Sequence, residues 1–263
     1  MSLWSMLNGT VINAITVVVG CALGLTVGGK LPDRYRRIVL DGLGLITITL
    51  GIDASVVMLG RLVGKFGPMI DASQTFGARL GMVTIGSLLV GSVIGTRLRL
   101  HERIESLGGL IHRSIGGKGE SGRFAEGFLF SSVIFCVGPL TLLGCLNNGT
   151  RGDPSLLYIK AVLDGFCSLA LAASMGAGVA GSILTILLFQ GALTLGFAHF
   201  ASDLPELCRD MMNVVGGIVL LANALMMLEI KKIPVANMLP GIFLPPAVIF
   251  LWEWAQPGMF LVQ

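Results

Sequence analysis

Eight mostly apolar stretches, each of about 20 residues, constrain the fold of this chain more than any other feature of its sequence. Each is long enough for one helical crossing of a bilayer, whose hydrocarbon core is about 30 Å thick. Charged residues make up only 13% of the chain, whereas a soluble domain has about 25%. The sequence therefore predicts an all-α integral membrane protein, organised as a single transmembrane domain over residues 1–263 with the lipid bilayer as its solvent. The expected spans cover residues 10–28, 40–59, 76–95, 128–146, 157–175, 179–197, 212–228 and 235–252.

The division between the fifth and sixth spans depends on a short glycine-rich segment. Residues 161–200 are almost continuously apolar, which is too long for one crossing and suits two. Residues 174–178 supply the turn, because glycine permits a reversal of the chain. If this segment instead continues one helix or forms a re-entrant element, the chain has seven spans.

The distribution of Lys and Arg predicts the side of the membrane on which each loop lies, since cytoplasmic loops carry an excess of both. With the N-terminus outside, 12 of the 18 basic residues fall in inner loops. Both termini are therefore expected outside. The longest inner loop, residues 97–125, separates the first three spans from the rest. No basic residue precedes Lys30, so we expect the first span to be a membrane helix rather than a cleaved signal.

Two pairs of similar segments suggest internal repeats of inverted topology. Residues 37–42 and 160–165 each place a base four residues before an aspartate at the start of a span. This match pairs residues 9–96 with 126–200, and the two spans enter from opposite sides, as an inverted repeat requires. Residues 31–33 resemble 204–206, which pairs spans one to three with spans six to eight instead. The two frames disagree, and the sequence leaves both open.

Glycines recur at the spacing of one helix turn in two spans. Small residues four apart allow helix backbones to approach closely, as in membrane-helix dimers. These positions therefore predict helix packing within the chain or a homo-oligomer through glycine faces. They are Gly20, Gly24 and Gly28 in the first span and Gly91 and Gly95 in the third.

Two aspartates fall within expected spans, where an ionisable group is costly and faces the bundle interior or water. Asp53 lies inside the second span and Asp164 about two turns into the fifth. Asp164 also follows Lys160 by four residues, so an ordinary ion pair near a helix start is an equal alternative. For Asp53 the alternative is a shorter helix that leaves the carboxylate at the outer interface.

Span four contains Gly138 and Pro139. Proline removes a backbone hydrogen bond, and broken helices in transporters expose carbonyls and helix ends to ions. A simple kink is the alternative, and residues 237–241 and 245–246 interrupt span eight similarly.

Neutral polar residues could line a path or join helices, with Asn13 the preferred site residue among them. The set comprises Asn13, Thr16, Thr47, Thr49, Thr141, Gln190 and Asn223.

Several classes of function lack a signature. The five cysteines form no CxxC pair and the three histidines lack the spacing of metal ligands. No Ser/His/Asp set or HExxH motif is present. We therefore expect no enzyme activity, no metal, no cofactor and no nucleic-acid partner.

Taken together, several motifs resemble a bacterial membrane family called domain of unknown function 554, or YdfK/YqgA-like. The resemblance spans nearly the whole chain and implies a polytopic protein of the bacterial inner membrane, without naming a substrate. Asp53 lies outside the family pattern. The motifs are Gly9-Thr10-Val11-Ile12-Asn13, Gly42-Leu43-Gly44-Leu45 with Gly51-Ile52, Phe135-Cys136-Val137-Gly138-Pro139 with Gly144, Lys160 with Leu163-Asp164-Gly165, and Asn237-Met238-Leu239-Pro240.

These features favour a transporter or channel-like protein for an ion or small solute. The alternative is a non-transporting scaffold assembled through the glycine faces, which predicts that Asp164→Asn keeps function while Gly24→Leu abolishes it. The residues expected to line the path are Asn13, Asp53, Gly138, Pro139, Lys160 and Asp164.

Overall fold

The described part of the chain is mostly helical and contains no β-strand. The computed structural model describes residues 2–27, 33–70, 75–103, 120–136, 138–201, 203–258 and 260. Gly28 and most of the expected inner loop, residues 104–119, lie outside these ranges. The helices are α1 (Leu3–Val27), α2 (Asp33–Ile52), α3 (Met58–Ile70), α4 (Phe76–Arg97), α6 (Glu120–Cys136), α7 (Pro139–Arg151), α8 (Ser155–Met175), α9 (Ser182–Thr185), α10 (Gly191–Phe200), α11 (Glu206–Met227) and α12 (Leu244–Ala255). Two π-helical turns, η1 (Asp53–Val57) and η3 (Ile186–Gln190), and two 3₁₀ segments, η2 (Ala177–Gly181) and η4 (Val235–Phe243), join some of them.

The number of membrane spans agrees with the sequence prediction of seven or eight. Among the described residues, seven helices are long and apolar enough to cross a membrane. The pair Gly127–Cys136 and Pro139–Arg151, bent by 59°, adds an eighth if it counts as one span. The second span is longer than predicted and runs over Gly44–Met69, because α2, η1 and α3 continue one another.

The chain divides into two compact units. Unit 1 comprises Met1–Leu43 and Glu102–Asp203, and unit 2 comprises Gly44–His101 and Leu204–Gln263.

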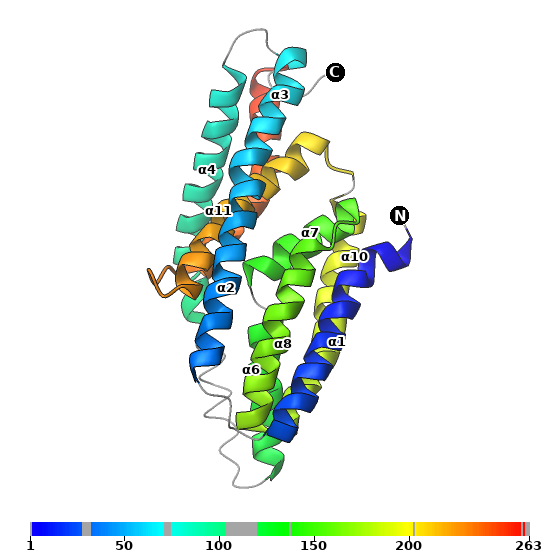
Figure 1. The fold of residues 1–263 in the computed structure, drawn as a ribbon. Helices are drawn as coiled ribbons and strands as arrows, with labels where there is room; N and C mark the ends of the chain where they lie inside the picture. The colour runs from blue at the N-terminus through cyan, green and yellow to red at the C-terminus, as the bar shows by residue number, and fades with distance from the viewer. Residues whose placement is uncertain are drawn as a thin grey trace. The chain divides into compact units, whose positions relative to one another are not determined.

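In unit 1, α1 and α8 run side by side in the same direction (Figure 1). A Cβ atom on Gly20 would overlap the backbone of Gly165, and one on Gly24 would overlap that of Leu169. The described part of the first glycine line therefore packs against a helix of the same chain.

Gly176 makes the turn between α8 and η2. Its φ of +83° is a conformation that glycine adopts readily and L side chains rarely do. Residues Ser155–Met175 and Ala177–His199 are consequently two separate candidate spans, as the glycine-rich segment predicted. After the turn, Gly178 of η2 lies against the carbonyl group of Phe124 in α6.

In unit 2, α11 runs antiparallel to the α2–η1–α3 helix: Gly44 lies against Leu228, Gly51 against Leu221, and Lys65 pairs with Glu206. The helix α4 runs antiparallel to η4 and α12, with Gly91 and Gly95 against the backbones of Gly241 and Asn237. A buried cluster joins these helices and contains Leu62, Phe76, Leu80, Val83, Leu207, Cys208, Met211, Val214, Ile249 and Phe260.

Within each unit the helices run in the directions that the predicted succession of spans requires. Spans one and five are both expected to run inward, and α1 and α8 are parallel. Spans two and seven are expected to oppose each other, and the α2–η1–α3 helix and α11 do. The cytoplasmic side and the inverted repeats stay predictions.

Candidate functional site

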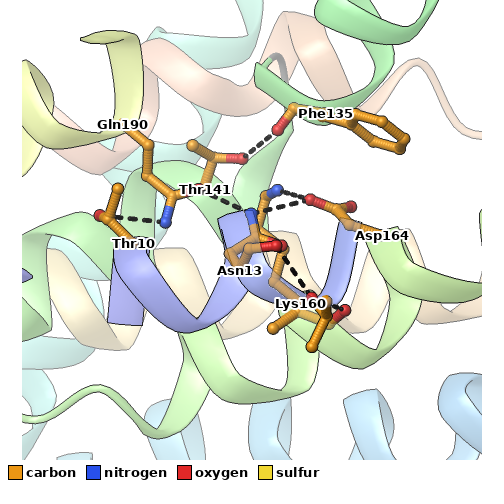
Figure 2. A network of polar contacts seen from close by, with 9 residues as sticks. Thr10, Asn13, Phe135, Thr141, Lys160, Asp164 and Gln190 are labelled. Carbon is orange, nitrogen blue, oxygen red and sulfur yellow. Dashed lines mark hydrogen bonds and ion pairs between the residues drawn. The ribbon is translucent and has the colours of Figure 1, made fainter. Parts of the chain in front are cut away.

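The interior of unit 1 holds a set of polar side chains that are almost fully buried between apolar helices. Thr10 and Asn13 come from α1, Lys160 and Asp164 from α8, and Gln190 from η3 (Figure 2). As whole residues, they range from 0% exposed for Asn13 and Gln190 to 7% exposed for Asp164. Three segments far apart in the sequence therefore build one polar site.

Asn13 lies at the centre of the site (Figure 2). Its Nδ2 group donates to Oδ2 of Asp164 at 3.0 Å and to Oε1 of Gln190 at 3.1 Å. The Nε2 group of Gln190 donates in turn to Oγ1 of Thr10 at 3.2 Å. A continuous hydrogen-bonded chain therefore crosses from α8 through α1 to η3.

Lys160 forms an ion pair with Asp164 one helix turn away, and Nζ also donates a hydrogen bond to Oδ2. The two side chains are only 6% and 10% exposed. The pair expected from the four-residue spacing is therefore present, but it is buried rather than solvated. A buried pair gains little net stability, although removing one partner is costly because it strands a charge.

The backbone of α1 and α8 holds the site together beside these side chains. The hydroxyl of Thr16 donates both to the carbonyl of Asn13, at 2.9 Å, and to that of Ala161, at 2.8 Å. The glycines farther along α1 bring the two backbones close enough for such a short side chain to bridge them.

The π-helical turn η3 carries Gln190 at its last position. Such turns interrupt regular helices and occur frequently at functional sites. The thiol of Cys145 in α7 lies 3.5 Å from the carbonyl oxygen of Gln190 and can donate to it. This contact links α7, which follows the break in span four, to η3, which carries the side-chain amide of Gln190.

Span four is broken at the predicted place, since α6 ends at Cys136 and α7 begins at Pro139. Proline has no N–H to donate to the carbonyl four residues earlier, which is that of Phe135. The hydroxyl of Thr141 lies 3.4 Å from this oxygen and donates to it (Figure 2). Gly138 is extended, with φ −170° and open space around its Cβ position. Pro139 therefore accounts for the break, and Thr141 replaces the missing bond.

One acceptor of the site has no hydrogen-bond partner among the described residues, namely Oδ1 of Asn13. A buried polar atom left unpaired costs about 1–3 kcal/mol. The site can therefore accept one further hydrogen bond from a donor that enters it.

Asp53 belongs to η1 of unit 2, whereas the network lies within unit 1. Its Oδ1 atom is 3.6 Å from Nη2 of Arg61, and both side chains are more than half exposed. The helix continues to Ile70, so Asp53 is near the middle of a candidate span and not at a helix end.

Of the site residues expected from the sequence, Asn13, Lys160 and Asp164 meet, and Gln190 and Thr141 belong to the set of neutral polar residues. The contributions of Thr10 and Cys145 were not expected. Thr10 stands in an apolar helix three residues before Asn13, so helical periodicity could have placed it on the same face. Nothing in the sequence distinguishes Cys145 from the other cysteines.

Comparison with known proteins identifies similar chains of unknown activity. Residues 8–250 match the family described as "Protein of unknown function (DUF554)". The chain is 28% identical over 243 residues to "Uncharacterized membrane protein YdfK" of Bacillus subtilis (strain 168), covering 92% of this chain and 96% of that protein. It is 31% identical over 252 residues to "Uncharacterized protein YqgA" of Escherichia coli (strain K12), covering 94% and 98%. No solved structure matches. The family match covers most of the chain, as do both relatives, so the chain belongs to the DUF554 family of membrane proteins.

Proposed function

We propose that this protein is a transporter or channel-like protein for an ion or small solute. The observation that carries the proposal is the buried network around Asn13, Lys160 and Asp164. Charged and amide groups of this kind are costly inside membrane spans and commonly mark the route of an ion or solute. Purely structural helix packing, which the glycines already supply, does not require a lysine and an aspartate in the same interior.

The broken fourth span supports the same function. Transporters often place cargo beside interrupted helices, where helix ends and freed backbone groups can bind it. Thr141 and Phe135 flank the break on the side of Gln190 and Asp164 in Figure 2. The free acceptor on Asn13 gives an entering donor one further contact.

In this proposal the protein lies in the bacterial inner membrane with both termini outside. The basis is the excess of basic residues in the loops assigned to the cytoplasm. A reporter that is active only in the cytoplasm, fused at either end, would be inactive if this orientation is correct.

Transport is tested with purified protein in liposomes. The panel measures flux of Na⁺, K⁺, Cl⁻ and H⁺ with ion-sensitive dyes, and of glycerol and urea by light scattering. Flux above that of empty liposomes in any arm supports the proposal, and background flux throughout the panel contradicts it.

The variant Asp164→Asn should abolish the flux of the wild-type protein. Asp153→Asn is the matched control, because Asp153 is exposed and its carboxylate accepts hydrogen bonds from the neighbouring Ser155. Equal flux in the two variants would show that the network does not take part.

The variant Gly24→Leu does not distinguish the scaffold alternative from transport. Gly24 packs against the backbone of α8 inside unit 1, so Gly24→Leu would disrupt the unit under either hypothesis. A scaffold is better distinguished by retained function in Asp164→Asn.

A further inference from the structure

The middle of the second span carries a charged face that the network in unit 1 does not explain. We define the charged face as Asp53 in η1 with Gly60, Arg61, Gly64 and Lys65 in α3. We propose that this face lines a water-filled vestibule that extends from the membrane surface near Lys65 to Asp53 at mid-membrane depth.

The depth of the charges follows from the length of the span. Gly44–Met69 has 26 residues, and a helix of about 20 residues crosses the hydrocarbon core. Counted from Gly44 at about 1.5 Å per residue, Asp53 lies about 14 Å along the span and Arg61 about 26 Å. Asp53 is thus near the centre of the core, and Lys65 is near its far boundary.

The opposite side of the same helix is apolar and buried in unit 2. Leu62 is only 1% exposed and belongs to the buried cluster of this unit. Met58, Leu59, Val63 and Phe66 pack against that cluster. The charges therefore point away from the core of unit 2, and the exposed side of the helix is mixed, because Val56 and Val57 are exposed between Asp53 and Gly60.

The charges on this face form two ion pairs at the surface of unit 2. The side chains of Asp53 and Arg61 are 58% and 64% exposed, and their closest atoms are 3.6 Å apart. That separation exceeds an ordinary hydrogen bond and suits a bridging water. Lys65 pairs with Glu206 at 2.6 Å, and both side chains are again half exposed.

Lipid is a poor occupant of this face, because charges at mid-membrane depth lie against protein interior or water. Each charge has a partner of opposite sign, so the charged face is electrically balanced and suits water or a hydrated solute of either sign. Nothing within 4 Å meets a Cβ atom built on Gly60 or Gly64, so open space lies beside the charges.

The helix α4 offers matched positions on a surface of the opposite character. Gly81 and Gly86 also have open space around their Cβ positions. Their neighbours Met82, Ile85 and Leu89 are apolar and more than half exposed, as expected for contact with lipid. Gly86 lies near the middle of Phe76–Arg97 and Gly81 nearer its first end.

The test is thiol accessibility in lipid vesicles. Single variants Asp53→Cys and Gly60→Cys are compared with Gly86→Cys and Gly81→Cys at similar depths. A small, positively charged methanethiosulfonate is added on both sides of the membrane, and labelling is followed by intact mass. The wild-type protein measures the background from its own cysteines, of which Cys21, Cys136, Cys145 and Cys208 are buried and Cys167 is partly buried.

A cysteine in water ionises and reacts, whereas one in lipid stays a thiol and does not meet the reagent. We expect Asp53→Cys and Gly60→Cys to react on the order of tenfold faster than the α4 variants. Equal, slow labelling of all four, with full labelling after denaturation, would overturn the vestibule. So would a disulfide between two copies at Gly60→Cys in place of labelling, because the face would then be a dimer contact.

Folding of each variant is checked by its elution volume and thermal unfolding, and Gly64→Cys serves as a further position if Asp53→Cys does not fold. The outcome is independent of the proposed function. Labelling without measurable flux would support the vestibule and count against transport. Flux without labelling would support transport and count against the vestibule.

Discussion

The buried pair of Lys160 and Asp164 gives the sharpest test of the site, because its two charges depend on each other. Asp164→Asn leaves an ammonium group in the interior of unit 1, and Lys160→Met leaves a carboxylate there. Removing one partner of a buried pair costs about 3–5 kcal/mol, whereas replacing both is often close to neutral. Asparagine at 164 still offers an oxygen to Nδ2 of Asn13, so the hydrogen bond of 3.0 Å can persist.

We therefore expect the free energy of unfolding to fall by about 3–5 kcal/mol in each single variant. In the double variant Lys160→Met/Asp164→Asn it should fall by about 1 kcal/mol. For a protein of this size, 1 kcal/mol shifts the midpoint of thermal unfolding by about 2–4 °C. Each single variant should then unfold on the order of 10 °C below the wild-type protein. The double variant should unfold only a few degrees below it.

Thermal unfolding in detergent, followed by the fluorescence of the three tryptophans, measures these shifts. The double-mutant cycle should give a coupling of at least about 5 kcal/mol between the two positions, which is the sum of the two single losses less the loss of the double variant. Additive losses, or single variants within about 2 °C of the wild-type midpoint, would refute the reasoning. The same double variant separates folding from transport, since it should fold and show no flux.

Three further predictions concern the break, the glycine contacts and the amide. Thr141→Val should lower the free energy of unfolding by about 1–2 kcal/mol, because it leaves the Phe135 carbonyl unpaired. Thr141→Ser should lower it less, since serine keeps the hydroxyl. Equal losses in the two variants would exclude a stabilising hydrogen bond from Thr141 to this carbonyl. Gly95→Ala should reduce the yield of folded protein because the added methyl meets backbone, whereas Gly86→Ala, with open space, should not; similar yields on size-exclusion chromatography would contradict the packing. Gln190→Leu should lower flux with little change in elution volume, and unchanged flux would remove Gln190 from the site.

The sequence predicted those features of the fold that depend on local composition. The lengths of the apolar stretches predicted the positions of the spans. Pro139 predicted the position of the break, because the missing N–H group of proline acts locally. Glycine at 176 likewise predicted the turn after the fifth span. The bend between α6 and α7 is 59°, and the sequence predicted the place of the break without its angle.

The candidate site was predictable only in its separate parts. Asn13 lies 151 residues from Asp164 and 177 residues from Gln190 along the chain. One sequence does not say which faces of distant helices meet. The π-helical turn at Gln190 has no sequence signal that we recognise, and it decides where the amide lies. The sequence identified the polar residues, but it did not predict that they would contact one another.

The glycine lines and the polar network are two aspects of one arrangement in unit 1. Gly20 and Gly24 let α1 approach the backbone of α8, and the side chain of asparagine is too short to bridge helices at ordinary separation. Asn13 reaches Asp164 at 3.0 Å because the helices are already close farther along. A larger side chain at Gly20 would therefore disturb the polar site without touching it. Loss of activity in a glycine variant is consequently no argument for a scaffold, and only changes among the polar residues themselves separate assembly from transport.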